Sequence, residues 1–164
     1  MKFADFLINT KQFLIKRIAE LFGILILLSG AIILLSLITY SPDDPNFIIG
    51  KNNDVKNILG YKGSVVSDFL FQSIGMIAFL IPFTLFFSGL NIFIKKRQII
   101  FIDNLFFCIL YIIFGCLFFS FFKDQSFFLT VNGNGGFTGL FLKDSFLNKL
   151  IKNKVLLILK LILT

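Results

Sequence analysis

Long apolar stretches alternate with short polar segments along the chain. The first stretch, residues 21–40, carries no charge and spans about 30 Å as a helix, which matches the hydrocarbon core of a bilayer. The second, residues 69–94, spans about 39 Å, so we expect it to tilt or kink. The third covers residues 104–122, or starts at Ile99 if its helix begins early. This pattern predicts three full transmembrane helices.

The first apolar stretch ends at a group of turn-forming residues. Pro42 and Pro45 fix φ and lack a backbone donor, so a helix cannot continue through them. Four residues beside them can bond their own backbone: Ser41, Asp43, Asp44 and Asn46. This group predicts the exit of the first helix from the membrane, followed by a polar outer loop over about residues 41–66.

Three features predict how the second helix begins and bends. Ser64 or Ser67 can act as its N-cap, with Asp68 in the first turn, where the helix dipole favours a carboxylate. Pro82 lies near the middle of the apolar stretch and removes one backbone hydrogen bond. We therefore expect a kink at Pro82, and prefer a structural kink to a functional hinge.

The two ends of the chain are less apolar. Residues 1–20 have roughly helical spacing of apolar residues, and they either lie on the cytoplasmic leaflet or, as we prefer, extend the first span into water. Residues 123–150 carry too much charge to cross lipid and predict an outer loop with an interfacial helix. Residues 151–164 are enough for only a partial fourth span. We expect a cytoplasmic segment, 1–20, and a truncated membrane domain, 21–164.

Composition supports lipid as the solvent. Hydrophobic residues make up 57% of the 164 residues and charged residues only 15%, against about a quarter in soluble domains. The fold class predicted is an all-α, polytopic transmembrane helix bundle. The net charge of +7 is spread between apolar stretches, which favours a membrane surface over nucleic acid as the partner.

The densest positive charges predict the orientation. Lys16 and Arg17 precede the first span, and Lys95, Lys96 and Arg97 separate the second from the third. Positive residues close to span ends stay in the cytoplasm, so we expect a cytoplasmic N-terminus. Asp103, at the edge of the third span, is interpreted as a solvated cap rather than a proton relay.

Sequence signals for chemistry are missing. The chain has no histidine and no GxxxxGK[ST] phosphate-binding loop, and Cys108 and Cys116 lack the spacing of a metal or redox pair. We expect inert buried thiols, no catalytic, metal or cofactor site, and no cofactor. The apolar spans also carry no acid, which disfavours an ion pathway.

Several short motifs, in one register, resemble a known family. Residues 39–45, Thr-Tyr-Ser-Pro-Asp-Asp-Pro, are similar to the (S/T)YxPxDP segment that ends the first span in the membrane domain of the FtsK/SpoIIIE DNA translocases. The residues that carry this first match are Tyr40, Pro42, Asp44 and Pro45. The remaining matches are Asn57, Gly60 and Gly63 of an NxxGxxG segment, Asp68, Gly75 and Pro82 of the second span, and Gly135, Gly136 and Gly139 of a GGxxG segment.

The resemblance implies a four-helix anchor in the bacterial cytoplasmic membrane, at the division septum. In full-length proteins of this family, such an anchor tethers an ATP-driven double-stranded DNA pump that acts in cell division and chromosome segregation. It also implies contacts with other division proteins and with copies of itself. No motor motif occurs here, so we expect no enzymatic activity and no direct contact with nucleic acid. The alternative is a small independent polytopic protein, either a carrier or a pore.

Overall fold

The computed structural model describes residues 2–46, 54–122, 129, 132–147 and 149. Within these residues the chain is helical and contains no strand, which confirms the all-α prediction. The elements are α1 (Lys2–Ile38), α2 (Gly60–Ile74), the 3₁₀ helix η1 (Gly75–Phe79), α3 (Leu80–Lys95), α4 (Ile99–Phe119), α5 (Gly136–Leu142) and the π-helix η2 (Lys143–Leu147). The expected partial span, 151–164, lies outside the described residues.

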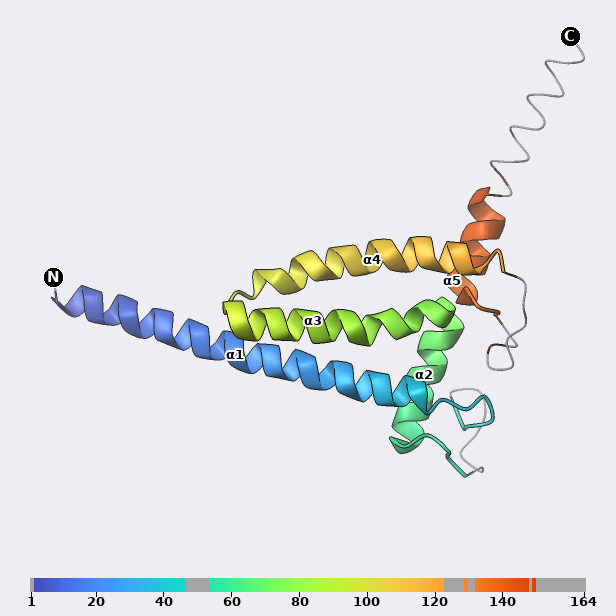
Figure 1. Cartoon of the computed structure of the whole chain (residues 1–164), viewed down its shortest axis with the longest axis horizontal. Coiled ribbons are helices and arrows are strands. Elements are labelled where there is room, and N and C mark those ends of the chain that lie inside the picture. The colour runs from blue at the N-terminus through green and yellow to red at the C-terminus, as the bar shows by residue number, and fades with distance from the viewer. Residues whose placement is uncertain (1, 47–53, 123–128, 130–131, 148, 150–164) are drawn as a thin grey trace, which may run out of the picture.

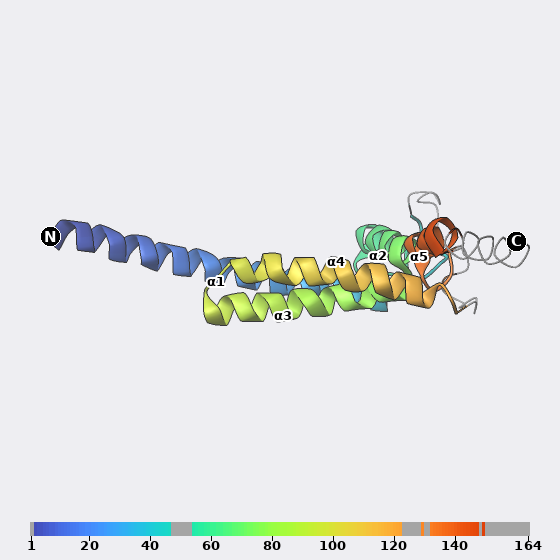
Figure 2. The same ribbon diagram turned by 90° about the horizontal axis from the view of Figure 1, so that it is seen from above.

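Three long helices lie side by side, with α3 between α1 and α4 (Figures 1 and 2). At one end α2 crosses the end of α1, and α5 lies beside the end of α4 (Figure 1). Three helical stretches among the described residues are long and apolar enough to span a membrane: Phe6–Ile38, Gly60–Lys95 and Ile99–Phe119. Helix α1 is continuous through residue 20 and projects past the α3–α4 loop (Figure 1).

Close backbone contact joins α1 to α3. A Cβ atom at Gly23 would lie 2.8 Å from the Gly89 carbonyl oxygen, and one at Gly89 would lie 2.7 Å from the Gly23 carbonyl oxygen. About two turns further along α1, a Cβ at Gly30 would lie 3.1 Å from the Pro82 carbonyl oxygen. Helices in lipid associate largely through such packing, so the small residues of α1 have α3 as their partner.

Gly23→Ala is expected to lower the free energy of unfolding by about 1 to 2 kcal/mol, because the added methyl group forces α1 and α3 apart. The measurement is unfolding in mixed detergent micelles. Leu25→Ala is the control, since Leu25 lies on the same helix and its side chain is 56% exposed. Equal losses in both variants would contradict the proposed α1–α3 contact.

The start of the second span differs from the prediction. Helix α2 begins at Gly60, with Leu59 at the N-cap and no side-chain cap, so neither Ser64 nor Ser67 caps it and the polar loop is shorter than expected. Asp68 lies in the middle of α2 rather than in its first turn. Both serines are buried, and each hydroxyl instead donates to a backbone carbonyl.

The bend in this span occurs at Gly75, and the kink expected at Pro82 is wrong. The chain turns at Gly75, which has φ 66° and ψ −144°, and passes through η1 before α3 begins. Pro82 is the third residue of α3. A proline is tolerated there, because the first turn of a helix has no intrahelical partner for its backbone N–H groups.

The third span begins at Ile99, the early alternative. Asp103 is therefore the fifth residue of α4, where it is exposed to the surroundings of the bundle rather than placed at the helix edge. Two side-chain contacts hold α4 against α3: the Tyr111 and Thr84 hydroxyls are 2.9 Å apart, and Asn104 donates to the Ser88 hydroxyl at 2.7 Å. Polar contacts of this kind stabilise helix pairs in lipid.

Candidate functional site

The loop between α1 and α2 is fixed by one buried carboxylate. Asp44 is 2% exposed, and its two oxygens accept the backbone N–H groups of Lys56 and Asn57, each at 2.9 Å. Pro42 and Pro45 provide the turn that brings Asp44 back toward these amides. A carboxylate holding two amides is a strong, directional contact, so it ties the first part of the loop to the segment entering α2.

Asn57 joins the same segment to the end of α1. Its side-chain amide donates to the Ser36 carbonyl at 2.9 Å and to the Thr39 carbonyl at 3.3 Å, and its oxygen accepts the Leu59 N–H at 3.1 Å. The last carbonyls of a helix have no partner within the helix. Asn57 therefore caps α1 from a position far along the chain.

Small residues allow α2 to approach this group. The Ser36 hydroxyl donates to the Gly63 carbonyl at 2.6 Å, and the Ser64 hydroxyl donates to the Pro45 carbonyl at 2.5 Å. A Cβ at Gly63 would lie only 2.2 Å from the Asn57 side-chain oxygen. Gly60 makes the turn into α2 with φ 65°. These contacts lock α1, the loop and α2 together.

Tyr40 and Asp68 form a second link between α1 and α2. The Tyr40 hydroxyl donates to an Asp68 oxygen at 3.2 Å, and the ring lies against Phe71 with 4.8 Å between centroids. Burial, together with the nearby Asp68 carboxylate, raises the pKa of Tyr40 to about 12. The phenol therefore keeps its proton and remains the donor at neutral pH.

A junction of glycines brings α5 against η1. A Cβ at Gly75 would lie 2.0 Å from the Asn134 carbonyl oxygen, which accepts the Met76 N–H at 2.9 Å. A Cβ at Gly136 would lie 2.5 Å from the Gly75 nitrogen, and Gly136 also has a positive φ, 63°. The backbones of the two segments approach so closely at Gly75 and Gly136 that a side chain at either position would not fit.

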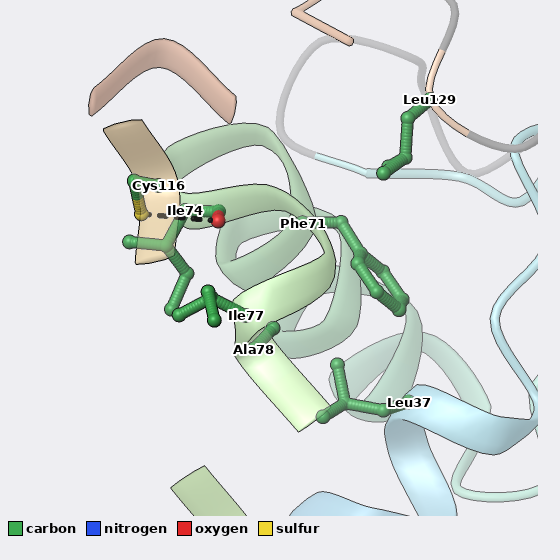
Figure 3. Close-up of a cluster of buried hydrophobic side chains, with 7 residues drawn as sticks. All are labelled: Leu37, Phe71, Ile74, Ile77, Ala78, Cys116 and Leu129. Atoms are coloured by element: carbon green, nitrogen blue, oxygen red, sulfur yellow. Dashed lines mark hydrogen bonds between the residues drawn. The ribbon is translucent and has the colours of Figure 1, made fainter. Parts of the chain in front are cut away.

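The same junction contacts α4. Cβ atoms at Gly135 and Gly139 would lie 2.5 Å and 2.3 Å from the Cys116 carbonyl oxygen. The Cys116 thiol donates to the Ile74 carbonyl at 3.2 Å, and both residues belong to a buried apolar cluster (Figure 3). The other members of that cluster are Leu37, Phe71, Ile77, Ala78 and Leu129.

The structure thus brings together the residues that carried the sequence resemblance. We call residues 39–46, 54–79 and 132–147 the loop end. It contains two sets of contacts, one around Asp44 and Asn57 and one around Gly75 and Gly136. Pro82 belongs to neither set, since it lies in α3 against α1. Ser36 completes the first set, and nothing in the sequence marked it, because its partners are distant in the chain.

The clustered cations lie at the opposite end of the bundle. Lys95, Lys96 and Arg97 form the end of α3 and the short loop before α4, with Lys96 in the left-handed conformation at φ 55°. Lys16 and Arg17 lie on α1 where it passes this loop. Glu20, which no sequence motif marks, contacts both Arg17 and Lys96 through its carboxylate. The cytoplasmic orientation of this end stays a prediction.

The polar groups of the loop end fasten backbone segments to one another. Its carboxylate, amide and hydroxyl groups contact carbonyl and N–H groups of neighbouring elements. Among the residues the structure describes, no three His, Cys, Asp or Glu side chains are grouped to hold a metal ion. The arrangement is suited to holding these backbone segments in fixed positions relative to one another.

Three membrane-length helices, closed at one end by a hydrogen-bonded loop assembly, define a polytopic membrane domain. Residues 15–164 match the model of the 4TM region of DNA translocase FtsK/SpoIIIE. The chain belongs to this family, and it is a membrane protein.

Individual relatives support the same assignment. The chain is 37% identical over 73 residues to the DNA translocase FtsK of Rickettsia typhi, a match that covers 44% of this chain and 10% of that protein. It is 40% identical over 62 residues to the Rickettsia bellii protein of the same name, covering 38% of this chain and 8% of the relative. The matched stretch therefore spans about a tenth of the length of these relatives. No solved structure matches significantly.

Proposed function

We propose that this chain is the membrane anchor of an FtsK-like DNA translocase and holds that translocase at the division septum, in the cytoplasmic membrane. The observation that supports this most strongly is the match of residues 15–164 to the family's membrane region. The relatives carry the name DNA translocase FtsK, but the matched stretch is only about a tenth of the length of those proteins. The proposed role is therefore anchoring and placement, without an enzymatic step in this chain.

The loop end supplies a surface for septal partners. Ile58 is 71% exposed in the turn before α2, and Val55 is also exposed nearby. The neighbouring Asn57 is buried and bonded on both sides, so these apolar side chains are held in a fixed position. Side chains that are already held in place lose little conformational freedom when a partner binds, so Ile58 and Val55 are the residues proposed to contact one. The partners proposed are division-site membrane proteins and further copies of this chain.

A chimera tests the anchoring role. The chain replaces the membrane region of a bacterial FtsK that keeps its own linker and motor, and the host gene is depleted. We expect a fluorescent version to gather at midcell and to restore division. A motor without any membrane region is the control and should do neither.

Two results would contradict the proposal. One is a chimera that is inserted at normal levels yet is spread evenly around the membrane of dividing cells. The other is solute flux through liposomes containing the purified chain alone, which would favour the carrier or pore alternative.

A further inference from the structure

Two cations from separate helices share one carboxylate where α1 passes the α3–α4 loop. Arg17 and Lys96 each contact an oxygen of Glu20 at 2.6 Å. The Glu20 side chain is only 16% exposed, whereas Arg17 is 60% and Lys96 41% exposed. The acid thus lies beneath the cations and holds their charged groups close together at the surface.

Positive charge exceeds negative charge at this place. We call Lys16, Arg17, Glu20, Lys95, Lys96 and Arg97 the basic end; its five cations and one acid leave a formal charge of +4. Lys16, Lys95 and Arg97 are exposed, and no other described residue forms an ion pair with them. Exposed cations that surround a neutralised pair are available to an anionic ligand.

Helix lengths place these charges at a membrane surface. Helix α4 has 21 residues and begins two residues after Arg97, so its length of about 31 Å puts the loop at one face of the hydrocarbon core. The part of α1 from Glu20 to Ile38 is about 28 Å long and leads to the same level. The basic end therefore lies at the depth of phospholipid phosphates.

Apolar side chains continue from the cations into the membrane region. Phe22 of α1 and Phe101 of α4 meet edge to face with 5.8 Å between centroids. Phe93, Ile94 and Ile99 are exposed beside the loop. Cations above exposed apolar side chains match both parts of a phospholipid: an anionic headgroup and its acyl chains.

We propose that the basic end is a binding site for an anionic phospholipid, whose phosphate lies between α1 and the α3–α4 loop. Arg17 and Lys96 contact the phosphate, and Lys95 and Arg97 flank it. Arginine matches the geometry of phosphate oxygens with two parallel hydrogen bonds. Glu20 competes with the phosphate for the same two cations, so it both assembles the site and limits its affinity.

The full chain is reconstituted in phosphatidylcholine vesicles that contain spin-labelled phosphatidylglycerol or spin-labelled phosphatidylcholine. We expect phosphatidylglycerol to be preferred at the protein surface by about fivefold, the effect of roughly one cation at a membrane surface. Lys95→Gln with Arg97→Gln should remove most of this preference. Glu20→Gln should increase it, because Arg17 and Lys96 then face the lipid alone.

The matched control removes two cations from the loop end, through Lys56→Gln with Lys62→Gln. An equal loss of preference in both double variants would overturn the proposal, since it would show attraction to net charge alone. A preference that stays unchanged or falls in Glu20→Gln would also overturn it. If Glu20→Gln fails to fold, Arg97→Gln alone still tests the proposal and should lower the preference for phosphatidylglycerol. Arg97 is exposed and forms no ion pair with a described residue.

Discussion

Gly75→Ala is expected to lower the free energy of unfolding by about 3 kcal/mol or more and to separate α5 from the rest of the loop end. Gly75 has φ 66° and ψ −144°, a conformation that residues with a Cβ rarely adopt. The added methyl group would also lie 2.0 Å from the Asn134 carbonyl oxygen. The atoms nearest to this methyl group are backbone atoms of Asn134 and Gly136, so no side-chain rotamer change relieves the clash.

Two measurements follow the effect of Gly75→Ala. Unfolding in mixed detergent micelles gives the loss of stability, and labelling of Cys116 by a membrane-permeable thiol reagent reports opening of the junction, since Cys116 is fully buried. Gly60→Ala is the matched control: Gly60 has nearly the same φ, 65°, but its Cβ would meet nothing within 4 Å. That variant should lose only about 1 to 2 kcal/mol. Equal losses would mean that the contact with Asn134 does not matter.

The bend at Gly75 could not be predicted from the sequence, whereas the membrane spans could. The membrane spans were predictable because lipid requires apolar stretches of a certain length, and three such stretches are present in the structure. The bend was not, because a proline has a known local effect whereas a glycine bends a chain only where its neighbours require it. Pro82 falls in a first turn that needs no donor, and Gly75 meets a segment about sixty residues away.

Helix ends depend on distant partners in the same way. Ser64 resembles a helix cap by composition, yet its hydroxyl donates to the carbonyl of Pro45, in the first part of the loop between α1 and α2. With Ser64 bonded to Pro45, α2 starts at Gly60 instead, where a positive φ makes the turn. Local sequence rules describe what a residue can do, and the tertiary contact decides which option is used.

The family motifs specified members of the loop end but not their arrangement. Asp44, Asn57 and Gly63 are far enough apart in sequence that only the structure shows one shared set of contacts. Ser36 and Glu20 were missed because an isolated serine or glutamate in an apolar helix has no characteristic spacing. Each takes its role from a partner more than twenty residues away.

Asp44→Ala is expected to destabilise the loop between α1 and α2 by about 3 kcal/mol, a loss similar to that expected for Gly75→Ala. The substitution removes the acceptor of two backbone N–H groups: that of Asn57, which is buried, and that of Lys56, which is partly buried. An unsatisfied buried donor costs about 1 to 3 kcal/mol, and the partly buried Lys56 N–H, which loses the same acceptor, adds a smaller cost. Hydrogen exchange at the amides of Lys56 and Asn57 measures the local opening directly, and both amides should exchange about a hundredfold faster or more.

The neighbouring acid provides the control for Asp44→Ala. Asp43 has a side chain that is 79% exposed and pairs with the exposed Lys56 ammonium at 3.1 Å. Surface pairs of this kind contribute roughly 0 to 1 kcal/mol, so Asp43→Ala should leave both exchange rates nearly unchanged. Similar acceleration in the two variants would show that negative charge in the loop, and not the buried carboxylate, protects these amides. If only Asp44→Ala accelerates exchange, the two prolines serve to deliver one carboxylate to two amides, and that contact sets the rigidity of the surface proposed to face septal partners.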